Sequence, residues 1–182
     1  MQLTVILGPM KSGKSYELIS HFAPLRYTTI PHGLYQSSRN VRDAQIESRI
    51  GTILEARKVT SLAEILPFDQ QIVGIDEFHM FAPEDVVHVE SLLRRGTRVV
   101  VSSLDTDYQG RLFESIKNLL ELGPHEVKFK RAVCETCKNP EAIYSQVYHN
   151  GEPVLDGMPP VIPDDGTFTY APVCRGCFVR LR

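Results

Sequence analysis

A short glycine-rich segment near the N-terminus constrains the fold of this chain more than any other feature. The segment, Gly8–Ser15, reads GPMKSGKS and fits the pattern G-x-x-x-x-G-K-[ST]. An apolar run, Leu3–Leu7, precedes it, and a helical pattern from about Lys14 to Ala23 follows it. A strand that enters a helix through such a loop is typical of parallel sheets with crossover helices, so the sequence predicts an α/β fold.

The same segment predicts a binding site for the phosphates of ATP. Glycines allow a tight turn, and successive backbone N–H groups with the helix N-terminus form a cradle for anions. Lys14 is expected to reach the β- and γ-phosphates, and the Ser15 hydroxyl is expected to ligate Mg²⁺. The alternative is a chance glycine-lysine turn, which the flanking strand and helix disfavour. The predicted phosphate-binding residues are Gly8, Pro9, Met10, Lys11, Ser12, Gly13, Lys14 and Ser15.

Two acidic residues, Asp76 and Glu77, follow a second apolar run at Ile72–Ile75. Because the carboxyl ends of parallel strands meet at one edge of a sheet, we expect both carboxylates near the glycine-rich loop. Asp76 is predicted to hold Mg²⁺ directly or through water. Glu77 is predicted to act as a general base or to position an attacking water. The alternative is a solvated helix start, where acidic residues are also favourable.

The alternation of apolar runs and amphipathic stretches continues to about residue 130, which we predict as one phosphate-binding domain. The further predicted strands are Gly33–Gln36, Arg98–Ser102 and Glu126–Phe129. The further predicted helices are Ser61–Leu66, Pro83–Arg95 and Phe113–Leu122, whereas Ser38–Arg49 is expected to be a loop or a mobile helix.

The composition of the chain excludes some classes of protein. The 182 residues are 42% hydrophobic and 23% charged, as in ordinary globular proteins, and leave room for one α/β core with a small appendage. A net charge of -2 argues against nucleic-acid binding by bulk charge. No apolar run approaches the roughly 20 residues of a membrane span. The N-terminus lacks a basic region before its apolar run, so we expect a buried strand, not a signal peptide, and a cytoplasmic protein.

The four cysteines form two C-x-x-C pairs, Cys134/Cys137 and Cys174/Cys177, with 36 residues between the inner cysteines. Two such pairs predict a closed structural zinc site of four thiolates, which has no open position for catalysis. Free thiols and disulfides are the alternatives. Residues 131–182 are therefore predicted to form a second, mostly irregular module, zinc-ribbon-like, whose long loop is anchored at both ends.

Four segments together resemble the zinc-containing thymidine kinase family: GPMKSGKS, IDEFHMF, LDTDYQGRLF and the two C-x-x-C pairs. Their order and approximate spacing cover nearly the whole chain. The resemblance implies a P-loop α/β domain, and a zinc-held lasso that closes over a nucleoside. It further implies ATP-dependent transfer to a 5′-hydroxyl with Glu77 as general base, and usually a homotetramer.

The resemblance also implies a nucleoside site. Tyr108 stands where the family has a phenylalanine, Ser145 where it has a lasso threonine or serine, and Tyr170 at its tyrosine before the second cysteine pair. Arg42 lies in a segment that resembles one near the phosphates. The implied nucleoside-binding residues are Met10, Leu104, Tyr108, Ser145 and Tyr170.

The chain departs from the family pattern at several positions. Asn40 replaces an aspartate, Gln109 and Val147 replace arginines, and His79 replaces a glutamine. A lone histidine beside carboxylates is expected to pack or to hydrogen-bond. The lasso, Val154–Gly166, is longer than the family's and lacks its Val/Ile-Gly-Gly element.

The composition of the lasso bears on nucleoside selection. Its prolines lack N–H donors, and its aspartates accept hydrogen bonds but cannot donate them at neutral pH. We therefore expect weaker or altered selection, with pyrimidine deoxynucleosides still preferred. The residues concerned are Asp156, Pro159, Pro160, Pro163, Asp164 and Asp165.

Two other functions remain open at this point. One is a P-loop ATPase whose zinc module binds a partner protein or single-stranded nucleic acid. The other is a degenerate family member that senses nucleotide without transferring phosphate, which Asn40 and the altered lasso keep open.

Overall fold

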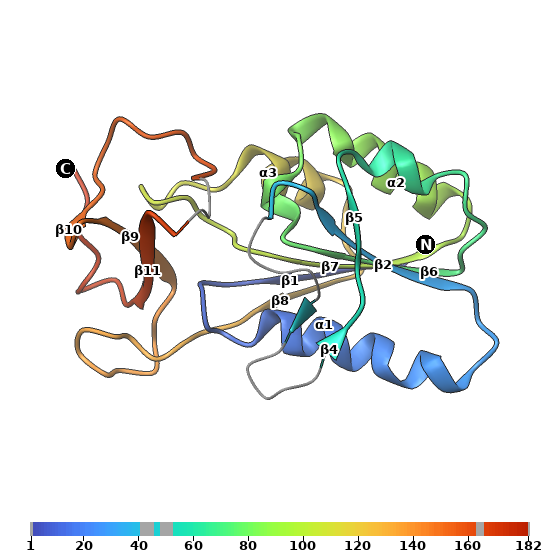
Figure 1. Ribbon diagram of the computed structural model, residues 1–182, viewed down its shortest axis with the longest axis horizontal. Coiled ribbons are helices and arrows are strands. Elements are labelled where there is room, and N and C mark those ends of the chain that lie inside the picture. The colour runs from blue at the N-terminus through green and yellow to red at the C-terminus, as the bar shows by residue number, and fades with distance from the viewer. Residues whose placement is uncertain (1, 41–45, 48–52, 163–165, 182) are drawn as a thin grey trace.

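The computed structural model describes residues 2–40, 46–47, 53–162 and 166–181. Its larger part is a six-stranded parallel sheet covered by helices on both faces, and its smaller part is a three-stranded antiparallel sheet (Figure 1). The predicted α/β class is confirmed.

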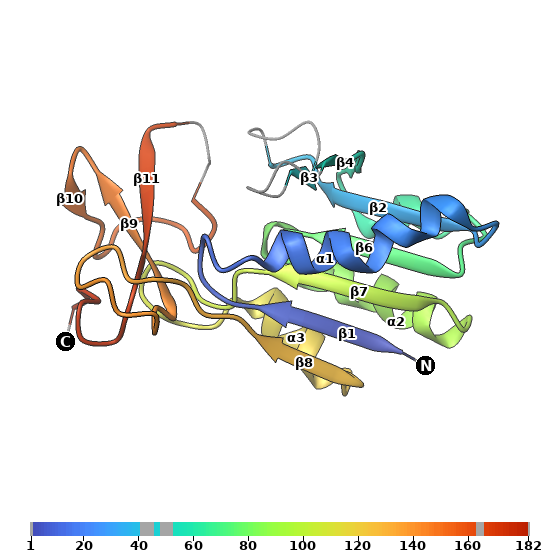
Figure 2. The same ribbon diagram turned by 90° about the horizontal axis from the view of Figure 1, so that it is seen from below.

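The strand order of the large sheet is β5-β2-β6-β7-β1-β8 (Figure 2). Strand β1 lies between β7 and β8, and β6 lies on the other side of β7, so the carboxyl ends of β6, β7 and β1 are neighbours. In Figure 2 these ends point toward the small sheet. The strands are β1 (Leu3–Leu7), β2 (His32–Ser37), β5 (Arg57–Val59), β6 (Ile72–Asp76), β7 (Arg98–Ser103) and β8 (Glu126–Phe129).

Helix α1 covers one face of this sheet, and α2 and α3 cover the other (Figure 1). Successive side chains of a strand point to opposite faces. In β1, accordingly, Val5 packs in the cluster under α2 and α3, whereas Ile6 packs in the cluster under α1. The helices are α1 (Lys14–Phe22), α2 (Val86–Arg94) and α3 (Glu114–Glu121).

Among the described residues, four short 3₁₀ helices connect these elements. One of them was predicted as Ser61–Leu66, where the Ser61 and Glu64 side chains form the expected capping box. Strand β5 was not predicted, because its three residues include the exposed Arg57 and Lys58 and carry little apolar signal. The 3₁₀ helices are η1 (Ala23–Tyr27), η2 (Leu62–Ile65), η3 (Phe78–Met80) and η4 (Pro83–Asp85).

The predicted second module contains a small sheet that was not predicted, although most of its described residues lie outside strands. Strand β9 (Tyr144–His149) pairs antiparallel with β10 (Glu152–Pro153) and with all six residues of β11 (Phe168–Val173). The apolar side chains of Val147 and Phe168 pack against the first module, and this contact organises the segment. The sequence gives little sign of these strands, because β9 buries the polar Ser145 and Gln146 and β11 contains Pro172.

Part of the segment Ser38–Arg49 lies outside the described residues, and so does Arg42. Its described end is not helical: strand β3 (Ile46–Glu47) pairs antiparallel with β4 (Ile53–Leu54). Across the described part of the chain, the helices are too short or too polar to span a bilayer.

Candidate functional site

The glycine-rich loop joins β1 to α1 through conformations that favour glycine. Gly13 precedes α1 with a φ of 81°, and Gly8 has a φ of 149°. A Cβ at Gly8 would lie 2.5 Å from the carbonyl oxygen of Lys130, so a larger residue would clash with backbone. The loop closes on itself, because the buried Lys14 ammonium donates to the carbonyl of Pro9 at 2.8 Å. The eight predicted phosphate-binding residues therefore form one compact turn at the start of α1.

The predicted magnesium ligands lie side by side. Asp76 ends β6, and its Oδ2 accepts a hydrogen bond from the Ser15 hydroxyl at 3.3 Å. Its Oδ1 accepts from the backbone N–H of Glu77 at 3.0 Å and from the hydroxyl of Ser102. Burial raises the pKa of Asp76, while the bond from Ser102 and the charge of Lys14 oppose that shift. This pocket of hard oxygen donors suits Mg²⁺.

The Lys14 ammonium stands among carboxylates. Burial lowers its pKa, and the negative charges of Glu77, Asp76 and Asp105 oppose the shift. Sequence reasoning missed Asp105, whose own pKa is raised by burial. The rule that found Asp76 could have found it, because Asp105 also follows the end of a buried strand, β7.

Glu77 has a strained backbone, with a φ of 51° that non-glycine residues rarely adopt. Such strain concentrates at functional sites. The conformation ends β6 and starts η3, and it directs Glu77 to the wall of a cavity. One carboxylate oxygen, Oε2, lies 3.3 Å from Nδ1 of His79.

His79 is buried, and its ring packs on Phe113 with centroids 4.8 Å apart. Its backbone N–H donates to the Ser103 hydroxyl at 2.9 Å, and its Nδ1 lies 3.2 Å from the same oxygen. Burial, assisted by the charge of Lys14, lowers the pKa of His79 to about 3. The imidazole is therefore neutral near pH 7, so its contact with Glu77 is not an ion pair. These contacts agree with the packing and hydrogen-bonding role expected for this histidine.

The lowered pKa predicts that His79 makes the fold acid-sensitive. The unfolded histidine, with a pKa near 6.5, binds more protons than the folded one between about pH 3 and pH 6.5, so stability falls as pH falls. From pH 7 to pH 5 we expect the free energy of unfolding to fall by about 2 kcal/mol more in the wild type than in His79→Gln. Urea unfolding of both proteins across this range measures the difference. Parallel pH profiles would contradict it.

One cavity brings together Glu77 and all five nucleoside-binding residues implied by the resemblance. Its wall is formed by the glycine-rich loop, the segment after β7, strands β9 and β11, and the lasso. The lasso, which the resemblance implies to close over a nucleoside, contributes Pro160, Val161 and Ile162 to the wall. The implied residues on the wall are Met10, Leu104, Tyr108, Ser145 and Tyr170.

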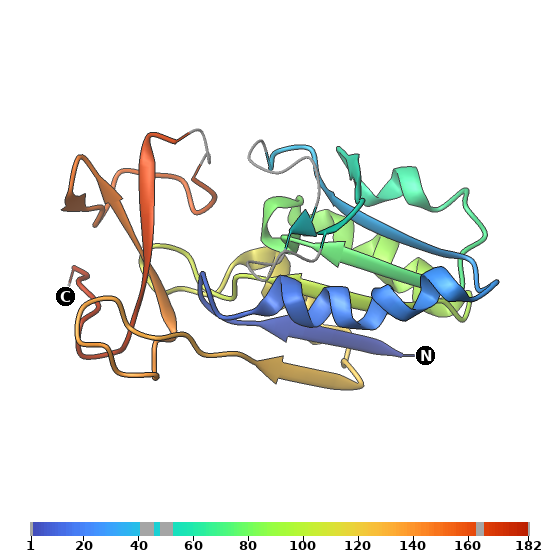
Figure 3. The ribbon, with the colours of Figure 1, turned by 60° about the horizontal axis from the view of Figure 1, so that its bottom comes forward.

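The small sheet contacts the glycine-rich loop directly. The Ser145 hydroxyl, on β9, accepts a hydrogen bond from the backbone N–H of Met10 at 2.9 Å. Lys11 forms an ion pair with Glu135, which lies between the first two cysteines. These two contacts join the small module to the glycine-rich loop, and Figure 3 shows the loop after β1 next to the small sheet. A domain boundary between residues 130 and 131 remains our proposal.

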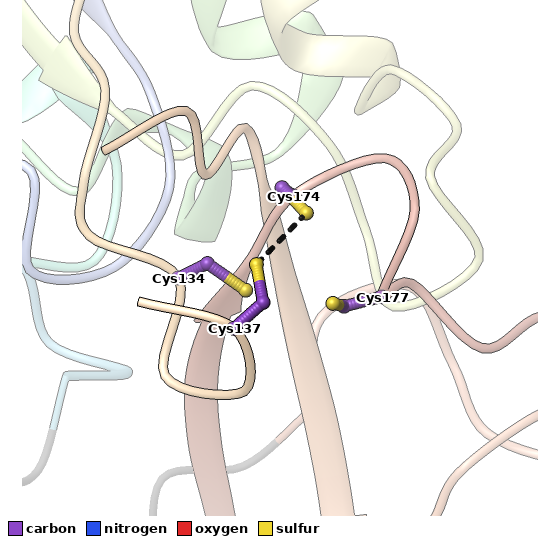
Figure 4. A group of neighbouring side chains, drawn as sticks. All are labelled: Cys134, Cys137, Cys174 and Cys177. Carbon is purple, nitrogen blue, oxygen red and sulfur yellow. Dashed lines mark hydrogen bonds between the residues drawn. The ribbon is translucent and has the colours of Figure 1, made fainter. Parts of the chain in front are cut away.

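The four cysteines converge at the base of the small sheet (Figure 4). Their sulfur atoms all lie within 4.8 Å of one another, with 3.7 Å between those of Cys137 and Cys174, and none forms a disulfide. Four thiolates at about 2.3 Å from a tetrahedral zinc would be about 3.8 Å apart, so the cluster fits a metal of this kind.

The pKa values of these thiols move in different directions. Although burial opposes it, hydrogen bonds from backbone N–H groups, led by that of Cys137, lower the pKa of Cys134 to about 6. Similar backbone bonds, led by that of Cys177, lower the pKa of Cys174. Bonds with Cys137 and Cys174 raise the pKa of Cys177 to about 12. Four thiolates this close repel one another, and a bound cation would remove that penalty.

Comparison with known proteins matches this chain to one family. The family model described as thymidine kinase matches residues 1–178. A thymidine kinase of Chloroflexus aurantiacus is 32% identical over 184 residues, covering 97% of this chain and 94% of the relative. One of Mesomycoplasma hyopneumoniae is 33% identical over 181 residues, covering 96% and 94%. One of Mycoplasma mobile is 30% identical over 183 residues, covering 98% and 87%.

Proposed function

The chain belongs to the thymidine kinase family, and we therefore propose that it transfers the γ-phosphoryl group of ATP to the 5′-hydroxyl of thymidine. The observation that carries this proposal is the shared cavity: Glu77 and the five implied nucleoside-binding residues line it, and the glycine-rich loop reaches its wall through Met10. Family membership supports a nucleoside kinase, while this cavity supplies a place for the nucleoside beside the predicted phosphate site.

The phosphates of ATP would lie on the backbone N–H groups of the glycine-rich loop, with Lys14 turning from the Pro9 carbonyl to the β- and γ-phosphates. Ser15 and Asp76 would hold Mg²⁺. The ion would neutralise the negative charge on the phosphate oxygens during transfer. Ser102 keeps the Asp76 carboxylate in place through its hydroxyl. Arg42 stays a proposed phosphate contact.

Glu77 would accept the proton of the 5′-hydroxyl as that oxygen bonds to the γ-phosphorus. The bond from the γ-phosphorus to the bridging oxygen breaks, and ADP leaves with the electron pair. Nδ1 of the neutral His79 lies 3.3 Å from Oε2 of Glu77, so the imidazole stands beside the proposed base. Because His79 stays neutral near pH 7, it does not compete for the proton.

We propose zinc as the metal of the four-cysteine cluster, with Cys134, Cys137, Cys174 and Cys177 as its ligands. Elemental analysis of the purified protein is expected to give about one zinc per chain, and Cys134→Ser is expected to lower that ratio. A chelator, but not a reductant, should then loosen the small sheet. A folded, active preparation with clearly substoichiometric zinc would contradict the assignment.

The substrate is tested by kcat/KM for a panel of nucleosides at saturating Mg²⁺–ATP, with the monophosphate product identified. Thymidine is expected to lead the pyrimidine deoxynucleosides, but by less than the ~10⁴-fold that a fully paired polar site reaches, because the lasso has few donors. A purine nucleoside as the best substrate, or no monophosphate from any nucleoside, would contradict the proposed substrate.

The family resemblance further supports a homotetramer that works in nucleotide salvage in the cytoplasm. These remain proposals, and light scattering of the purified protein tests the first of them.

A further inference from the structure

The side chain of Tyr108 contacts the lasso at two backbone groups of a single residue. Its hydroxyl donates to the carbonyl of Met158 at 2.9 Å and accepts from the N–H of Met158 at 3.3 Å. The residues that make this contact are 50 positions apart in the sequence. One phenolic oxygen therefore satisfies both hydrogen-bonding groups of a loop residue that has no sheet partner.

Two neighbouring contacts hold the same stretch of loop. The Gln109 amide donates to the carbonyl of Leu155 at 3.2 Å. The ring of Tyr108 is buried in an apolar cluster with Val154 and Ile162, the two ends of the described lasso loop, residues 154–162. Packing thus fixes the ends of this loop, and hydrogen bonds fix its middle.

The held loop forms part of the cavity wall. Immediately after Met158, the chain contributes Pro160, Val161 and Ile162 to the lining. The position of these three residues relative to a bound base therefore depends on where Met158 is held. Because Tyr108 uses both backbone groups of Met158, those groups are also unable to pair with a base.

We propose that the Tyr108 hydroxyl is a positioning group for nucleoside selection, which holds Met158 so that residues 160–162 stand against the nucleoside. This inference rests on the proposed function, because it assigns the cavity to a nucleoside. It goes further in giving the hydroxyl a task separate from that of the aromatic ring. The ring supplies a flat apolar face. The hydroxyl fixes how closely residues 160–162 approach the nucleoside.

The test is Tyr108→Phe, which keeps the buried ring and removes the single oxygen. We expect the KM for thymidine to rise about 5- to 10-fold, the effect of losing one or two neutral hydrogen bonds, while the KM for ATP stays within about two-fold. Backbone hydrogen exchange of residues 154–162 in the nucleoside-free protein should become faster. Gln109→Ala is expected to act in the same direction with a smaller change.

Tyr148→Phe is the matched control, because Tyr148 lies on β9 of the same sheet and does not line the cavity. It should change neither the KM for thymidine nor the loop exchange. A KM for thymidine in Tyr108→Phe that stays within two-fold or falls would overturn the proposal, whatever the exchange shows. Unchanged exchange at 154–162 would overturn it as well.

The exchange measurement needs no substrate, so it reports on the loop contact independently of catalysis. Turnover of thymidine by the wild type reports on the proposed function. The two can therefore fail separately: an inactive wild type with normal loop effects contradicts the function, and an active wild type without them contradicts the role of Tyr108.

Discussion

Glu77→Gln is expected to lower kcat for thymidine phosphorylation by about 10²- to 10⁴-fold, the usual contribution of a positioned general base. The amide has the shape of the carboxylate but cannot accept the proton of the 5′-hydroxyl. KM for both substrates should change much less, because Glu77 is proposed to act on the reacting proton and not to bind the base or the phosphates. Steady-state kinetics of the purified variant measure both parameters.

Glu114→Gln is the matched control for this substitution. Glu114 begins α3, its side chain is 60% exposed, and its ion pair with Lys117 lies on the surface. We expect wild-type kinetics from the control, and wild-type circular dichroism from both variants. If Glu77→Gln kept kcat within about tenfold of the wild type, Glu77 would not be the base.

Lys14→Ala is expected to lower kcat/KM by about 10²- to 10³-fold, as the removal of one preorganised charge from a transition state does. The ammonium is buried near three carboxylates within the glycine-rich loop, so it needs only to turn from the Pro9 carbonyl to reach ATP. Lys14→Arg should not restore activity, because the planar guanidinium does not replace a compact ammonium in a tight turn. Competition binding of ATP, together with kinetics, would show whether the loss falls on binding or on transfer.

The fold should survive the loss of Lys14. Its only described hydrogen bond is to Pro9 within the same loop, and Asp76 can take up a proton when the facing charge is gone. Lys117→Ala, on the exposed face of α3, is the control and should keep full activity. Near-normal turnover by Lys14→Ala would show that the glycine-rich loop does not carry the transferred phosphate.

Elements with a strong local signal were predictable from the sequence. The strand Leu3–Leu7 has the predicted ends because a buried parallel strand is a continuous apolar run. Glu126–Phe129, an exposed edge strand, also has the predicted ends and follows the turn signal of Gly123 and Pro124. The helix ends agree within three residues of the predicted ones at α1, α2 and α3. The cysteine cluster was also predictable, since C-x-x-C spacing already places two sulfur atoms close together.

What depended on distant contacts was not predictable. The small sheet forms where Val147 and Phe168 meet Tyr108, and this partner lies far away in the sequence. The bond between Tyr108 and Met158 left no local pattern, since Met158 sits in a stretch rich in glycine and proline. The strands of this module were missed because local propensity was weak and tertiary packing decided the structure.

The central claim is transfer of phosphate from ATP to thymidine, and its most direct test is ADP formation by the purified wild-type protein with and without thymidine. We expect ADP to form at a rate that depends on thymidine and saturates with it, with one thymidine monophosphate for each ADP. Steady ADP formation without thymidine would indicate an ATPase. ATP binding without turnover in either condition would indicate a nucleotide sensor, and either result would contradict phosphate transfer to thymidine.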